Sequence, residues 1–135
     1  MILVDTNVLI DVIESDPVWA DWSQQQLDLA TAIGEVVIND VVYAELSMGY
    51  QRIEELEQML AQTGIELVPI QRPALFLAGK VFRRYRAAGG LRTGVLPDFF
   101  IGAQATVMKA SLLTRDHTRY RTYFPDLSLI APSLN

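Results

Sequence analysis

The sequence predicts an α/β fold: a three-layer α/β/α sandwich around a central, mainly parallel five-stranded sheet. Short apolar runs alternate with longer segments of helical periodicity, which is typical of βαβ units with right-handed crossovers. The first run, Met1–Val4, contains no polar residue, as expected for a parallel strand covered on both faces. A length of 135 residues, half of them apolar, predicts a single domain over residues 1–135.

Each predicted element follows from a local signal. Asp16 followed by Pro17 is typical of a helix start, and Gly34 of the end of that helix. Asn39 and Asp40 are expected to cap the next helix. In chain order we expect strands over residues 1–4, 35–38, 65–69, 111–114 and 128–131, helices over 6–15, 17–33, 41–48, 51–62, 72–88, 97–109 and 117–123, and a glycine-rich loop over 89–94.

The composition excludes several classes of protein. The chain has no cysteine, which excludes disulfides and thiolate metal sites. Its single histidine, His117, excludes a ribonuclease mechanism that needs two histidines. No apolar run approaches the roughly 18 residues that span a bilayer. An acid at position 5, without a basic region before it, argues against a secretory signal. We therefore expect a cytoplasmic protein with no membrane partner.

The charge is divided unevenly between the two halves of the chain. Residues 1–66 contain thirteen acids and one base, for a net charge of −12, whereas residues 67–135 contain ten bases and three acids, for +7. Because a polyanion responds to the local field, the basic half suits a phosphodiester substrate, and equally an acidic protein partner. The alternative for Arg83, Arg84 and Arg86 is an ordinary solvated helix face.

Four carboxylates fall where predicted strands end or helices begin. Asp5 and Asp116 follow strands, whereas Glu45 and Asp98 lie early in helices. Taken singly, each could be a helix cap, a turn acid or a solvated residue. Ligands of open α/β sheets bind outside the carboxyl ends of the strands, so we expect all four to converge there. Acids so close together repel one another and need a cation or shared protons. The pattern predicts a hard-metal site made of oxygen ligands.

Four motifs carry a resemblance to a known family. They are Val4–Ile10, Val42–Leu46, Pro97–Ala103 and Leu113–Asp116. In this order, over essentially the whole chain, they resemble the PIN-domain ribonucleases, in particular the VapC-type toxins of toxin–antitoxin pairs. The resemblance implies an endoribonuclease that depends on Mg²⁺, with Mn²⁺ as an alternative, and that forms a homodimer. It also implies a cognate, VapB-like antitoxin whose carboxyl-terminal segment covers the site.

The resemblance assigns the four carboxylates, which we call the acidic quartet, to catalysis. Asp5, Asp98 and Asp116 match the metal ligands of the family, and Glu45 can act through a water. One departure concerns the last motif. Many relatives have a second acid soon after the position of Asp116, and this chain has none. The number of metal ions, one or two, is therefore open.

Further residues are candidates for the substrate or for support of the quartet. Thr6 and Asn7 match a polar pair that orients the first acid or touches substrate. Thr114 matches a hydroxyl that hydrogen-bonds a neighbouring carboxylate. Asp11 and Glu14 are expected on the outer, solvated face of the first helix. The candidate phosphate contacts in the basic half are Arg92, Arg115 and Arg119.

These residue types suit hydrolysis of RNA phosphodiester bonds. Mg²⁺ prefers oxygen ligands and keeps several waters, so one or two direct carboxylates suffice. A bound ion lowers the pKa of a water and offsets charge on the scissile phosphate. We expect in-line attack by a metal-activated water, which leaves a 5′-phosphate and a 3′-hydroxyl and needs no side chain as nucleophile.

Other functions are also considered. A phosphoacceptor receiver domain holds Mg²⁺ in carboxylates at strand ends, but it needs a lysine after the last strand, where this chain has Pro132–Asn135. A catalytically silent PIN-like interaction domain would keep the fold without the activity. A haloacid-dehalogenase-like phosphatase would need an Asp-x-Asp motif, and the third position here is Asn7.

Overall fold

The computed structural model describes residues 1–92 and 94–133, so the predicted loop 89–94 and the stretch 132–135 each include residues that lie outside it. None of the described helices is long and apolar enough to cross a membrane. The strands in this part are β1 (Ile2–Val4), β2 (Val36–Ile38), β3 (Glu66–Leu67), β4 (Ser111–Leu113) and β5 (Leu129–Ile130). The helices are α1 (Thr6–Ile13), α2 (Ala20–Ile33), α3 (Asp40–Ser47), α4 (Ile53–Thr63), α5 (Arg72–Ala87), α6 (Leu96–Met108) and α7 (His117–Tyr123).

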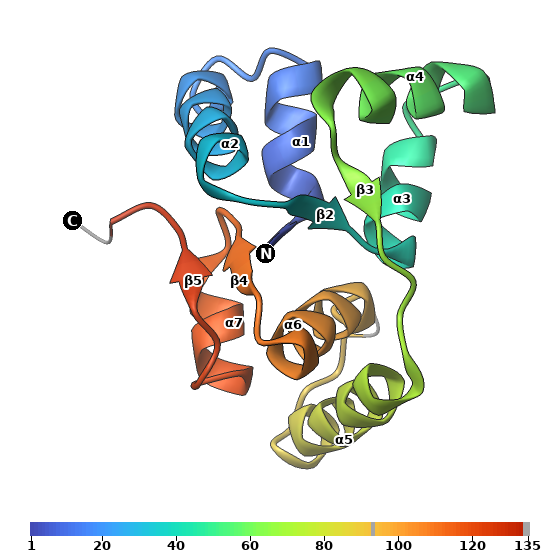
Figure 1. The fold of residues 1–135 in the computed structure, drawn as a ribbon. Coiled ribbons are helices and arrows are strands. Elements are labelled where there is room, and N and C mark those ends of the chain that lie inside the picture. Colours follow the sequence, from blue (N-terminus) through green and yellow to red (C-terminus); the bar gives the residue numbers. More distant parts are fainter. Residues whose placement is uncertain (93, 134–135) are drawn as a thin grey trace.

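All five strands form one parallel sheet, in the order β3-β2-β1-β4-β5. Figure 1 shows α1, α2 and α4 on one face of this sheet and α5, α6 and α7 on the other. The predicted fold class, a three-layer sandwich around a five-stranded sheet, is therefore confirmed. Receiver domains have the strand order 2-1-3-4-5, so the observed order argues against the receiver alternative.

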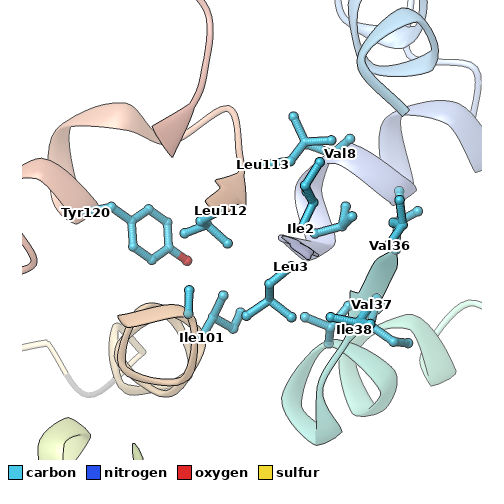
Figure 2. Packing of buried hydrophobic residues seen from close by; sticks show 14 of the residues in the cluster. Ile2, Leu3, Val8, Val36, Val37, Ile38, Ile101, Leu112, Leu113 and Tyr120 are labelled. Atoms are coloured by element: carbon cyan, nitrogen blue, oxygen red, sulfur yellow. The ribbon is translucent and has the colours of Figure 1, made fainter. Parts of the chain in front are cut away.

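The central strand β1 is enclosed on both faces. Leu3 and Val4 are fully buried, as are Ile38 of β2 and Leu112 of β4. Figure 2 shows Leu3 between the side chains of β2 and Ile101 of α6. The lack of polar residues in this strand therefore reflects burial against helices on either side of the sheet.

Close packing fixes the axis of α6. A Cβ atom added to Gly102 would come within 2.6 Å of the ring of Phe124, which follows α7, so a larger residue would force these two segments apart. Ala103 and Ala105 are also fully buried. These small residues let α6 pack closely, and they hold the helix that carries Asp98.

Two helix boundaries in the connection between α1 and α2 differ from the prediction by two or three residues. Helix α2 begins at Ala20 and not at Pro17, because the Asp16 carboxylate accepts two backbone N–H groups, at 2.8 and 2.9 Å, and closes a turn before the helix. Helix α1 ends at Ile13, and Ser15 then adopts a left-handed φ of 52°. Both differences lie in the connection between the first two helices.

The cap of α3 is Asn39, not Asp40. The Asn39 Oδ1 accepts the backbone N–H of Val42 at 3.0 Å. The Asp40 Oδ2 instead accepts the backbone N–H of Ile70, also at 3.0 Å. The Asp40 carboxylate thus ties the start of α3 to the segment that follows β3, which itself spans two residues rather than the five predicted.

The sheet order creates a switch point between β1 and β4. The chain leaves β1 for β2 on one side, and it leaves β4 for β5 on the other. Connections that part in this way open a crevice at the carboxyl ends of the two strands, which is where ligands bind in such sheets. The residues that follow β1 and β4 are therefore expected to form the ligand-binding site.

Candidate metal centre

Two members of the acidic quartet lie at this crevice. Val4 and Leu113 are paired in register, and the backbone N–H of Asp5 donates to the Leu113 carbonyl at 2.8 Å. Asp5 therefore lies beside Thr114, the residue that follows β4. Two residues later, Asp116 is the N-cap of α7.

Glu45 and Asp98 reach the same edge from helices. Helix α3 leaves the carboxyl end of β2, and Glu45 Oε1 accepts a hydrogen bond from the Thr6 hydroxyl at 2.7 Å. Helix α6 leads into β4, so it runs opposite to the strands and begins at their carboxyl edge. Asp98 lies in its first turn, where the helix dipole favours a negative charge.

Asp5 is buried, with 4% of its surface exposed, and neutral donors hold it. Its Oδ2 accepts hydrogen bonds from the hydroxyls of Thr114, at 2.8 Å, and Tyr120, at 3.1 Å. Asn7 Nδ2 lies 3.4 Å from the same oxygen, and the backbone N–H of Thr6 donates to Oδ1 at 2.8 Å. Donors from three segments thus fix the orientation of this carboxylate.

Tyr120 is a member of the site that sequence reasoning missed. It is fully buried on α7, and Figure 2 shows its ring beside Leu112 of β4. Burial, together with the charge of Asp5, raises the pKa of Tyr120 well above its usual value, so the hydroxyl stays a neutral donor. The available signal was its position one helical turn after Asp116.

Burial dominates the electrostatics of the quartet. It raises the pKa of Asp5 from 3.8 to about 7, and the charge of Asp98 adds to this rise. Burial also raises the pKa of Asp98, against the opposing charge of Arg119. Asp116 and Glu45 raise it further. The four carboxylates therefore influence one another, and Asp98 is the member that links them.

Arg119 lies between two of these acids. Its Nη1 hydrogen-bonds to Asp98 and lies 3.5 Å from Oδ2 of Asp116. The three side chains are 29%, 22% and 36% exposed, respectively. Burial disfavours the charge of Arg119, but the two carboxylates outweigh it and raise the pKa of Arg119. Arg119, predicted as a phosphate contact, is thus a counter-ion within the quartet.

Arg115 points away from the quartet and binds Asp11. Its Nε and Nη2 lie 2.6 and 2.9 Å from the two Asp11 oxygens, and the Ser23 hydroxyl donates to Asp11 at 2.8 Å. The guanidinium also lies 5.1 Å from the centre of a Trp19 ring. Asp11 is only 2% exposed, so the prediction that it is solvated is wrong. Only the backbone of Arg115 reaches the site, where its N–H donates to Asn7 at 3.2 Å.

The site opens onto solvent through Asp98 and Asp116, which are both partly exposed. An apolar hollow of about 220 Å³ lies between α1, α2 and α4, and none of the quartet lines it. Arg92, in the segment that leads into α6, is exposed, and its backbone N–H donates to the Tyr85 hydroxyl at 3.1 Å. The exposed basic residues of α5 are Arg72, Lys80, Arg83, Arg84 and Arg86.

The donor set fits a hard divalent ion. All four candidate ligands are carboxylates, and the buried Asp5 has only neutral hydrogen-bond partners. Within residues 1–92 and 94–133, no three acids or histidines form a closed ligand group as the side chains stand. Three of these carboxylates would therefore have to move closer together to bind one ion directly, although Mg²⁺ keeps several waters and needs only one or two direct carboxylates.

Several solved structures are similar to the chain. VapBC2 from Rickettsia felis, bound to a promoter DNA fragment, has a TM-score of 0.76 and 22% identity over 98% of this chain and 100% of the matched one. FitAcB from Neisseria gonorrhoeae has a TM-score of 0.69 and 21% identity over 96% of each chain. VapBC-1 from nontypeable Haemophilus influenzae has a TM-score of 0.71 and 19% identity over 97% of this chain and 98% of the matched one. At these identities the similarity shows the fold.

The family is shown by sequence. No curated protein sequence matches the chain. A family model described as the PIN domain matches residues 2–125, which include all four members of the acidic quartet. The chain belongs to the PIN-domain family.

Proposed function

We propose that this chain is a divalent-metal-dependent endoribonuclease and the toxin of a toxin–antitoxin pair. The observation that carries the proposal is the acidic quartet at the switch point of the sheet, with Asp5 buried and held by Thr114 and Tyr120. Membership of the PIN-domain family supports nuclease chemistry. A buried carboxylate with a raised pKa is typical of functional sites, which favours an active nuclease over a silent interaction domain.

The four carboxylates have two kinds of role in this proposal. Asp5, Asp98 and Asp116 hold the ion, Mg²⁺ or Mn²⁺, and Glu45 holds a water, with Thr6 fixing its side chain. When bound, the ion activates a water for attack and offsets charge on the scissile phosphate. The protein contributes orientation: neutral donors fix the Asp5 carboxylate and leave its negative charge uncompensated, as a ligand for an ion requires.

The surface suits RNA as the substrate. The quartet opens onto solvent, so a polymer can reach it without entering a cavity. The basic residues of α5 and Arg92 are exposed and precede α6, the helix that carries Asp98. Cationic side chains near such a site attract and position a phosphate backbone without reading its sequence.

The likeness to toxin–antitoxin complexes supports a protein partner. One similar structure is described as a toxin–antitoxin complex from Klebsiella pneumoniae, and another as a member of the VapBC family of toxin–antitoxin systems. We propose a VapB-like antitoxin that covers the quartet, a homodimer of this chain as the active form, and the cytoplasm as the place of action.

The proposal is tested by incubating the purified chain with total RNA. Cleavage is expected with Mg²⁺ or Mn²⁺, is expected to stop with EDTA, and should fall at least about 100-fold in Asp5→Asn and Asp98→Asn. Glu14→Gln is the matched control, because Glu14 is an exposed acid just after α1, as predicted. Equal cleavage by the wild type and both site variants would contradict the carboxylate mechanism, and no cleavage at all would favour a silent domain.

The toxin role has its own test. Expression of the wild-type chain alone should arrest bacterial growth, whereas Asp98→Asn at the same soluble level should not. Normal growth with abundant soluble wild-type protein would contradict the toxin role and leave the nuclease proposal to be judged by the cleavage assay.

A further inference from the structure

The two sides of the acidic quartet differ in how their charge is balanced. Asp98 and Asp116 share the guanidinium of Arg119. Asp5 has only neutral hydrogen-bond donors, and Glu45 accepts a bond from the Thr6 hydroxyl. In the part of the chain that the structure describes, Arg119 is the only lysine or arginine that pairs with the quartet.

The position of Arg119 is fixed by the helix that carries it. Asp116 caps α7, and Arg119 lies one turn later, with its backbone N–H 3.5 Å from the Asp116 carboxylate. The next residue, Tyr120, is fully buried and hydrogen-bonded to Asp5, so α7 cannot shift without breaking that contact. An arginine side chain keeps its charge at every physiological pH. One side of the site therefore carries a permanent, tethered positive charge.

From this asymmetry we propose that the site takes one divalent ion, held by Asp5 together with Asp98 and Asp116, and that Arg119, which pairs with Asp98 and Asp116, supplies the second positive charge. The inference rests on the proposed function, in that the quartet must bind a divalent ion. It settles the question left open by the sequence, namely whether one or two ions bind.

The chemistry of the replacement is consistent. In two-metal nucleases the second ion stabilises charge on an oxygen of the displaced group. A guanidinium can meet the same need, because its N–H groups form strong, charge-assisted bonds to phosphate oxygens. A second ion between Asp98 and Asp116 would have to displace a like charge that is attached to the protein. The chain also lacks the second acid that many relatives have soon after the position of Asp116.

The test counts bound Mn²⁺ per folded chain in the absence of RNA, by titration followed with electron paramagnetic resonance. The wild type should bind one ion. Arg119→Asp, which replaces the cation by a ligand, should bind two, and Arg119→Gln should keep the first site and gain a second, weaker one. Arg119→Lys, which keeps the charge, and Arg121→Gln, which removes an exposed cation from the same helix, should each bind one.

The ion counts test whether Arg119 takes the place of a second ion. Two ions in the wild type, or one ion in both folded Arg119→Asp and Arg119→Gln, would overturn the inference and leave the nuclease proposal intact if cleavage still needs metal. If Arg119→Asp does not fold, the Arg119→Gln count decides. No bound ion in the wild type, together with no EDTA-sensitive cleavage, would overturn the proposed function and this inference with it.

Discussion

Arg115 and Arg119 lie four residues apart and both bind aspartates, yet they serve opposite purposes. Arg115 binds both oxygens of Asp11, which is nearly inaccessible and also accepts a bond from Ser23. Arg119 binds carboxylates that are partly exposed. The first pair ties the loop after β4 to α1 and α2. The second joins Arg119 to two acids at the carboxyl edge of the sheet, where the metal site is proposed. Both pairs consist of an arginine and an aspartate, and they differ in how deeply the aspartate is buried and in how many further partners it has.

The largest expected effect is on stability. Arg115→Met leaves the buried Asp11 carboxylate without its partner, and should lower the free energy of unfolding by about 3–5 kcal/mol. Arg119→Met removes a partly exposed pair, and should change stability by about 1 kcal/mol or less. Urea denaturation followed by circular dichroism measures both. Equal losses in the two variants would refute the distinction between the pairs.

The next effect concerns Asp5, which is almost as buried as Asp11 but has no arginine. Because the pKa of Asp5 is raised from 3.8 to about 7 in the folded protein, the folded state binds a proton between these values that the unfolded state has lost. Stability should therefore fall as pH rises from about 4 to about 7, by on the order of 4 kcal/mol.

This fall is measured as a difference between the wild type and Asp5→Asn, both in EDTA. The wild type should lose stability relative to the variant as the pH rises from 4.5 to 8, and Mg²⁺ should reduce the loss because it stabilises the ionised carboxylate. If the difference in stability does not change with pH, burial does not raise the pKa of Asp5.

A smaller effect is expected for Thr114, a neutral residue that supports the quartet by hydrogen bonds and not by charge. Thr114 donates to Asp5 at 2.8 Å and accepts the backbone N–H of Asp116 at 2.9 Å, so it orders two candidate ligands at once. Thr114→Val should lower Mn²⁺ affinity about 10–100-fold, and Thr114→Ser should restore most of it. The exposed Thr118→Val is the matched control. Unchanged affinity in Thr114→Val would remove this residue from the site.

The features that depend on sheet topology could be predicted from the sequence. Strand ends and helix starts have strong local signals, and the rule for parallel sheets places residues after β1 and β4 together, so the convergence of Asp5 and Asp116 could be foreseen. The predicted start of α2 was wrong because a side chain, Asp16, closed a turn where the helix was expected.

The partners of individual side chains could not be foreseen. Asp11 faces the α1–α2 connection and the loop after β4, and only the three-dimensional packing shows that Arg115 reaches it. Likewise, the sequence predicted Arg119 as a phosphate contact, and only the packing shows that it pairs with Asp98. Tyr120 was not among the predicted site residues, although its hydroxyl donates to Asp5. Long-range contacts between polar groups depend on the final packing rather than on periodicity.

The chemistry of the cleaved ends tests the central claim most directly. An RNA oligonucleotide cleaved by the purified chain in Mg²⁺ should yield a 3′-hydroxyl on the upstream fragment and a 5′-phosphate on the downstream one, because a water attacks and no 2′-hydroxyl takes part. The Asp98→Asn protein, purified in the same way, should yield neither above background. A 2′,3′-cyclic phosphate and a 5′-hydroxyl, equally abundant with wild type and variant, would contradict hydrolysis at the acidic quartet.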